Sequence, residues 1–346
     1  MSDGRQTIVN QDLNRILWPL VGLGVILLFN LLFTPGFFRL EIKDGHLFGS
    51  LIDILNRGAP TMLLSIGMTL VFATGGIDLS VGSVMAISGA MAAYLIRPGY
   101  VHGILEYGKI QPLIVIIAIP LAISILLGLW NGLLVAYTGI QPIIATLILM
   151  VAGRGIAQLI TQGQILIFEH PPFQFIGSGF AFGLPFPIIL VIMTFAIAYL
   201  LTRKTALGLF IEAIGANPRA SRLMGIRAKH ILLSLYMFSA LCSGLAGLIV
   251  CADIKGADAN NAGLFLELDA IASVIIGGTM WGGRFTLVGS VIGTLIIQSL
   301  TTTVLTRGIA PEVTLVFKAI VIILVALIQS EGFRSAVAGR FHRTQS

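Results

Sequence analysis

Four polar side chains interrupt otherwise apolar runs and are the first candidates for chemistry in this chain. Asn131 lies in one such run, and Thr146, Arg154 and Gln158 lie in the next. At about 100° per residue, the last three fall within roughly 40° of one another on a helix, which predicts one polar stripe. Polar groups in a membrane are costly unless they face protein or a water-filled cavity. These groups suit a neutral, hydroxyl-rich solute, although Arg154 can equally pair with a carboxylate.

Two acidic residues open a later apolar run. Glu267 and Asp269 follow the amide-rich stretch 256–263, which reads GADANNAG. They predict an acidic entrance next to the polar stripe. Asp258, inside the stretch itself, fits an ordinary solvated loop.

The sequence patterns of several enzyme classes are missing. The sequence has no GxxxxGK[ST] loop for ATP and no GxSxG nucleophile motif. Its five histidines are scattered and show no paired-ligand spacing. We therefore expect no enzyme activity, no catalytic residue, no metal site and no cofactor bound by this chain.

The composition indicates an integral membrane protein. Of the 346 residues, 56% are hydrophobic and 10% are charged, whereas soluble domains carry about 25% charged residues. Mean hydropathy is +0.98. Forty glycines predict closely packed helices, because small residues let helix backbones approach in lipid. The net charge of +6 therefore points to membrane topology and lipid contact, and no nucleic-acid partner is expected.

The apolar runs predict an all-α integral membrane protein with ten transmembrane helices in a single domain, residues 1–346. The expected spans are 16–33, 60–73, 79–96, 110–135, 143–161, 185–201, 231–252, 268–281, 286–305 and 313–329. Lys and Arg are more frequent on the side that holds both ends, which places both termini in the cytoplasm. Residues 203–230 then form a cytoplasmic loop and residues 331–346 a cytoplasmic tail.

Two of these spans are too short for an easy crossing and stop at glycine pairs. The run 60–73 ends just before Gly75-Gly76, and the run 268–281 ends just before Gly282-Gly283. After each glycine pair the sequence continues through the tetrapeptide VGSV. Asp78 follows the first pair. Interrupted helices in both halves of a transporter mark the translocation path, so these residues are predicted to form a helix break and gate. An ordinary tight turn is the alternative, favoured at the second pair, and the repeat itself indicates either a duplication or chance.

A short amphipathic helix is predicted in the loop 203–230. Asn217 can cap it, a proline suits its first position, and Gly225 can end it. Leu223 falls on an apolar side, and Arg219 and Arg222 on a basic side. Such a helix on the basic face of a membrane protein predicts a docking surface for a cytoplasmic partner, with a plain surface loop as the alternative.

Four longer runs, in this order, resemble the permease subunits of ribose-type sugar ABC importers. They are Gly75–Met91 (GGIDLSVGSVMAISGAM), Ile140–Ile160, Thr205–Ile226 and Glu267–Arg284. Three others, His46–Pro60, Leu200–Gly208 and Ala252–Ile271, resemble the galactofuranose-importing members of that family in enteric bacteria. The bulky Thr279-Met280-Trp281 departs from the expected small, polar pattern.

The resemblance implies a bacterial inner-membrane permease that moves a monosaccharide inward by alternating access. It implies a second permease, identical or paralogous, a periplasmic sugar-binding protein and a cytoplasmic ATP-binding-cassette ATPase, which would hold the ATP. It also implies that the loop from Glu212 through Gly215 to Gly225 is a coupling helix on the ATPase. The alternative is an ion-coupled secondary transporter, which would need more ionisable residues in its spans than Arg154 and Lys318.

Overall fold

A computed structural model describes residues 2–43, 45–96, 100–101, 104–105, 111–310, 313–320 and 323, with side chains from residue 17 except at 100–101 and 104–105. Residues 313–320 are helical. The expected cytoplasmic tail, 331–346, lies outside the described residues, as does part of the expected span 313–329.

The chain is mostly helical. The helices are α1 (Ser2–Phe33), α2 (Ser50–Ala73), α3 (Val81–Ile96), α4 (Leu113–Leu133) with a π-helical extension η1 (Leu134–Thr138), α5 (Pro142–Thr161), α6 (Pro171–Ser178), α7 (Phe186–Arg203), α8 (Leu207–Ala216), α9 (Pro218–Leu223), α10 (Ala228–Asp253), α11 (Leu266–Ile276) and α12 (Leu287–Thr306). The strands are β1 (Glu41–Lys43), β2 (His46–Phe48), β3 (Tyr100–Val101), β4 (Ile104–Leu105), β5 (Leu166–Ile167), β6 (Phe180–Ala181), β7 (Leu184–Pro185) and β8 (Gly256–Ala257).

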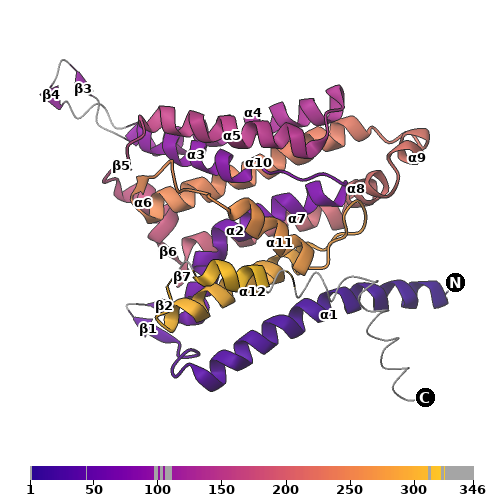
Figure 1. The fold of residues 1–346 in the computed structure, drawn as a ribbon, viewed down its shortest axis with the longest axis horizontal. Coiled ribbons are helices and arrows are strands. Elements are labelled where there is room, and N and C mark those ends of the chain that lie inside the picture. Colours follow the sequence, from indigo (N-terminus) through magenta and orange to yellow (C-terminus); the bar gives the residue numbers. More distant parts are fainter. Residues whose placement is uncertain are drawn as a thin grey trace.

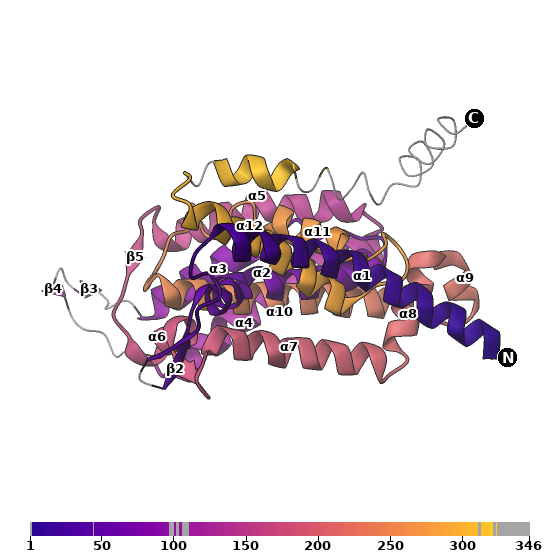
Figure 2. The same ribbon diagram turned by 90° about the horizontal axis from the view of Figure 1, so that it is seen from below.

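The long helices run roughly along one axis of the molecule, and the two ends differ. Figures 1 and 2 show α9 at one end and the short strands at the other, with the N-terminus at the α9 end. The strand pairs β1–β2, β3–β4 and β6–β7 are antiparallel hairpins. β5 pairs with β8 and so joins two loops that are distant in sequence.

The core is built around α10, which packs against α2, α3 and α4. Glycines allow these close contacts: a Cβ on Gly128 would lie 2.5 Å from the carbonyl oxygen of Tyr236, and one on Gly247 2.3 Å from that of Met85. The glycine content thus brings helix backbones together, as the composition predicts.

Large apolar side chains cover the outer faces of α1, α4 and α5, for example Leu31, Leu126 and Val151. Within the described residues, five helical segments are long and apolar enough to cross a membrane. They are Leu113–Thr138, Pro142–Thr161, Phe186–Arg203, Ala228–Asp253 and Leu287–Thr306. The chain is a multi-pass membrane protein, and these five segments lie within five of the ten expected spans or overlap them.

Two expected helix boundaries are wrong. The run 60–73 is not short, because α2 begins at Ser50 and continues through Pro60. A proline removes one intrahelical hydrogen bond, and the surrounding bundle keeps the helix intact. The run 268–281 is instead shorter than expected, since α11 ends at Ile276 and Gly278 takes a φ of +80°. The two VGSV tetrapeptides do open helices, α3 and α12.

Candidate functional site

The connection between α2 and α3 is a non-helical segment, residues 74–80, buried in the bundle. It leaves α2 through Gly75, which has a φ of +81°, and it runs from the α8 end back toward the middle of the molecule (Figure 1). Asp78 and Ser80 are each 1% exposed. Non-helical backbone at membrane depth is stable only when protein or a water-filled cavity surrounds it.

Asp78 holds this segment in place through three hydrogen bonds. Its Oδ1 accepts from the backbone N–H of Ser80 at 3.1 Å and from the Ser80 hydroxyl at 2.6 Å. Its Oδ2 accepts from the Ser239 hydroxyl of α10 at 2.8 Å. The carboxylate also lies at the N-terminal end of α3, where the helix dipole favours negative charge. These donors stabilise a buried carboxylate that has no cationic partner among the residues the structure describes.

Two of the predicted pathway residues contact the same segment. Asn131 of α4 donates from Nδ2 to the Ser80 hydroxyl at 2.9 Å. The hydroxyl of Thr146, on α5, lies 3.3 Å from the carbonyl oxygen of Ile77. Asn131 and Thr146 are both buried. They therefore position the segment between α2 and α3 from two other helices.

Two buried polar atoms on the helices next to this segment have no hydrogen-bond partner in the described part of the chain. They are Oδ1 of Asn131 and the hydroxyl oxygen of Tyr236. A Cβ on Gly76 would lie 2.7 Å from that hydroxyl, so the tyrosine lies directly against the backbone. Sequence reasoning missed Tyr236 and Ser239; the polar residues of α10 carry no signal that distinguishes them from ordinary helix packing.

A second group joins α5 to the loop between α10 and α11. Nη1 of Arg154 donates to the carbonyl oxygens of Ala259 at 3.0 Å and Ala262 at 2.5 Å. Gln158 donates from Nε2 to Oδ1 of Asn260 at 2.9 Å. The polar stripe of α5 thus binds the amide-rich stretch, and the hydrogen bonds of Arg154 go to backbone carbonyls instead of a carboxylate.

Glu267 lies close to this second group and keeps an unused acceptor. The side chain is 3% exposed, and Oε2 has no hydrogen-bond partner within the described residues. A Cβ on Gly82 would lie 2.5 Å from that atom, so Glu267 lies against the start of α3. The same Cβ would lie 2.4 Å from the carbonyl oxygen of Gly263, so the glutamate also lies beside the amide-rich loop. Arg154, Gln158 and Glu267 therefore form one polar group around the amide-rich loop.

Asp258 organises that loop. Oδ2 accepts from the Asn261 amide at 2.7 Å, and Oδ1 accepts from the backbone N–H groups of Asn260 and Asn261. The Asn261 hydrogen bond holds the pKa of Asp258 below its usual range. The loop is thus a folded structure rather than a plain solvated connection.

Asp269 forms an ion pair and is not part of the polar group around the amide-rich loop. Its Oδ2 lies 2.6 Å from Nζ of Lys318 in an ion pair whose side chains are 15% and 17% exposed. This pair joins α11 to the helical residues 313–320. Asp269 is therefore already engaged in a structural contact.

The two predicted helix breaks lie side by side. The backbone N–H of Gly282 donates to the carbonyl oxygen of Phe72 at 3.1 Å, and that of Gly283 donates to Ala73 at 2.8 Å. The rings of Phe72 and Trp281 have centroids 5.3 Å apart. The second break thus provides backbone donors to the last carbonyl groups of α2, of which Phe72 also accepts from the N–H of Gly75. The bulky Trp281 packs against the first break.

The short helix α9 has the predicted capping. Oδ1 of Asn217 accepts from the backbone N–H groups of Arg219 at 3.1 Å and Ala220 at 3.0 Å. Gly225 follows the helix with a φ of +82°. Leu223 and Met224 are 89% and 82% exposed, and Arg219 and Arg222 are exposed as well. We call these four exposed residues the α9 surface.

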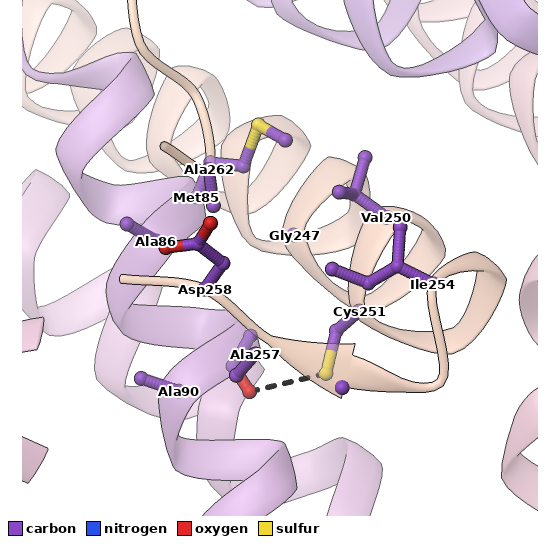
Figure 3. A pocket seen from close by; sticks show the side chains of 12 residues that line it. Met85, Ala86, Ala90, Gly247, Val250, Cys251, Ile254, Ala257, Asp258 and Ala262 are labelled. Atoms are coloured by element: carbon purple, nitrogen blue, oxygen red, sulfur yellow. Dashed lines mark hydrogen bonds between the residues drawn. The ribbon is translucent and has the colours of Figure 1, made fainter. Parts of the chain in front are cut away.

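Two hollows do not suit a polar solute. The one in Figure 3 lies between α3, α10 and the amide-rich loop, and its ≈ 10 Å³ is about the minimum for one water molecule. Cys251 donates there to the carbonyl oxygen of Gly89. A larger hollow of ≈ 400 Å³ between α2, α7 and α12 is lined by apolar residues alone, including Met62, Val191 and Val291.

No group of three or more potential metal ligands occurs within the described residues.

Comparisons with known proteins identify the family of this chain. A family described as branched-chain amino acid transport system / permease component matches residues 50–326. The chain is 52% identical over 331 residues to the galactofuranose transporter permease protein YtfT of Escherichia coli K12, covering 94% of each chain.

Two further relatives import other sugars. Identity is 37% to the fructose import permease protein FruF of Bifidobacterium longum, covering 92% of this chain and 88% of the relative. It is 34% to the ribose import permease protein RbsC of Escherichia coli K12, covering 86% and 88%. No solved structure gives a significant match.

Proposed function

The chain belongs to the family of branched-chain amino acid transport system permease components, and we propose that the sugar it imports is galactofuranose. It is a membrane-spanning permease subunit of a sugar ABC importer and not an enzyme. The substrate proposal rests on the 52% identity to a galactofuranose permease over nearly the whole of both chains.

The α9 surface carries the proposal for how the permease is driven. A six-residue helix with a side-chain cap exposes two large apolar side chains and two arginines at one end of the bundle. Leaving Leu223 and Met224 in water is unfavourable, by about 25 cal/mol per Å² of apolar surface. A cytoplasmic ABC ATPase that covers this surface would bind ATP, and no cofactor would bind to the permease itself. The N-terminus would then be cytoplasmic, since α1 begins at the same end, and the C-terminus is proposed to lie on the same side.

The sugar path is proposed to pass the two polar groups described above. Arg154, Gln158 and Glu267 would face the sugar on the periplasmic side, where the amide-rich loop lies at the end opposite to α9. Asn131 and Thr146 would lie deeper, at the segment between α2 and α3. Amide, hydroxyl, carboxylate and guanidinium groups provide the paired donors and acceptors that sugar hydroxyls need.

The remaining partners are proposed from the nature of the importer. A periplasmic sugar-binding protein would deliver the sugar to the hairpin end of the bundle. A second permease, identical or paralogous, would complete the transport unit, and lipid would cover the apolar outer faces. The helix breaks around Gly75-Gly76 and Gly282-Gly283, with Asp78, would form the gate.

Reconstitution tests this function directly. The permease, its ATPase and its binding protein are placed in liposomes, and uptake of labelled galactofuranose, ribose and fructose is measured with and without ATP. We expect accumulation of galactofuranose that needs ATP and all three proteins. Accumulation by the permease alone would contradict the proposed energy source, and equal uptake of ribose would contradict the substrate.

A further inference from the structure

We propose that Gly215 of α8 is the positioning residue through which movement of the α9 surface reaches both helix breaks and the buried segment 74–80. This inference rests on the proposed docking of an ATPase on α9. It assigns Gly215 a role inside the bundle, in place of direct contact with the ATPase.

Gly215 lies where three backbones meet. A Cβ at this position would lie 2.0 Å from the carbonyl oxygen of Ala73, 2.7 Å from the backbone nitrogen of Gly283 and 2.8 Å from the carbonyl carbon of Gly282. A contact below 3 Å to backbone cannot be relieved by rotating a side chain. The end of α2, the second break and α8 therefore pack against one another without intervening side chains, and only glycine fits.

The two breaks are also bonded to each other at this point. Gly282 and Gly283 donate to the last carbonyl groups of α2, and the Phe72 and Trp281 rings pack beside them. A second contact holds the same region, because Nη2 of Arg203 on α7 donates to the carbonyl oxygen of Phe285 at 2.9 Å. The region around Gly215 is thus tied by a hydrogen bond to the C-terminal end of α7.

The segment 74–80 starts from this unit and ends among the proposed pathway residues. It continues directly from Ala73, and Asp78 fixes it to Ser239 of α10. Asn131 and Thr146 hold it from α4 and α5. A displacement of α8 against Ala73 must therefore change the position of this segment or break one of these hydrogen bonds. Close-packed contacts of this kind favour discrete arrangements over gradual deformation.

The alternative route by which movement of α9 can reach the bundle is through α10, the helix that follows α9 in the chain. That route reaches the segment 74–80 beyond the end of α2, where Tyr236 lies against Gly76 and Ser239 donates to Asp78. Gly215 of α8 instead contacts the last residue of α2 and both glycines of the second break at one point. Gly215 is accordingly the point where movement of α9 is applied to the gate.

The test is Gly215→Ala in the reconstituted complex, with Gly24→Ala as the matched control, because a Cβ on Gly24 of α1 meets nothing within 4 Å. We expect Gly215→Ala to capture the ATPase as wild type does and to retain basal ATP hydrolysis. The stimulation of ATP hydrolysis by sugar should fall by about 10-fold or more, and so should the amount of sugar taken up per ATP. A change of this size is within the range measured for energetic coupling between distant sites. Gly24→Ala should match wild type.

Ser239→Ala provides a second test that adds no steric overlap. It removes one hydrogen bond to Asp78, and Ser239 lies on α10, not on the α8–α9 pair. It should lower sugar-driven stimulation while capture of the ATPase stays unchanged. Normal coupling in either variant would overturn the relay, as would loss of ATPase capture in Gly215→Ala. If wild type itself shows no ATP-driven uptake, the proposed function fails instead.

Discussion

The capping residue of α9 gives the most direct test of the docking surface. Replacing Asn217 by alanine removes both hydrogen bonds from its Oδ1 to the backbone N–H groups of Arg219 and Ala220. Loss of an N-cap costs about 1 kcal/mol, which is about a five-fold change in an equilibrium constant. A six-residue helix is marginal by itself, so this loss should lower the population of the folded α9 surface by up to about five-fold.

The assay is the affinity of the permease in nanodiscs for its ATPase, combined with hydrogen exchange over residues 219–225. Asn217→Ala should weaken binding by about two- to five-fold and raise exchange in this stretch. Asn217→Ser is the matched control, because serine caps as well as asparagine, and it should resemble wild type. Equal binding by Asn217→Ala, or equal weakening by both variants, would refute the reasoning.

Three other predictions follow from the described contacts. Arg219→Glu combined with Arg222→Glu should abolish ATP-driven uptake while the protein stays folded, and normal uptake in vesicles would reject docking at α9. Asn131→Leu or Gln158→Leu should reduce sugar uptake more than the amount of protein inserted in the membrane, as measured by transport and immunoblot; unchanged uptake would remove these residues from the path. Asp78→Ala should destabilise the protein by about 1–3 kcal/mol, because it leaves buried hydroxyl donors unpaired, and an unchanged Tm in detergent would contradict this role.

The sequence predicted the features that depend on local signals. Apolar runs of helical length gave the membrane class and the ends of several helices, such as Phe33, Ala73 and Ile96. The Asn217 cap and the Gly225 termination were also predicted correctly. These signals act within one or two turns, so they can be seen without knowledge of any neighbour.

Helix boundaries failed where the tertiary structure outweighed the local signal. The apolar run predicted a span over 60–73, but α2 begins at Ser50 and runs through Pro60. Gly282-Gly283 suggested the end of a span, whereas α11 ends earlier, at Ile276. In both cases packing against other helices decides how far the hydrogen-bonded backbone continues.

By itself, the sequence determined that this chain is a multi-pass membrane permease with two glycine breaks, a polar stripe on one span and a short capped helix. Only the tertiary structure decided which of these features meet. It brings Gly215 against the end of α2 and the second break, joins Asn131 and Thr146 to the segment held by Asp78, and places Asp269 in an ion pair with Lys318. Some contacts link residues more than 200 positions apart in the sequence, as Phe72 and Gly282 show. No local periodicity or motif specifies which buried polar groups will become partners.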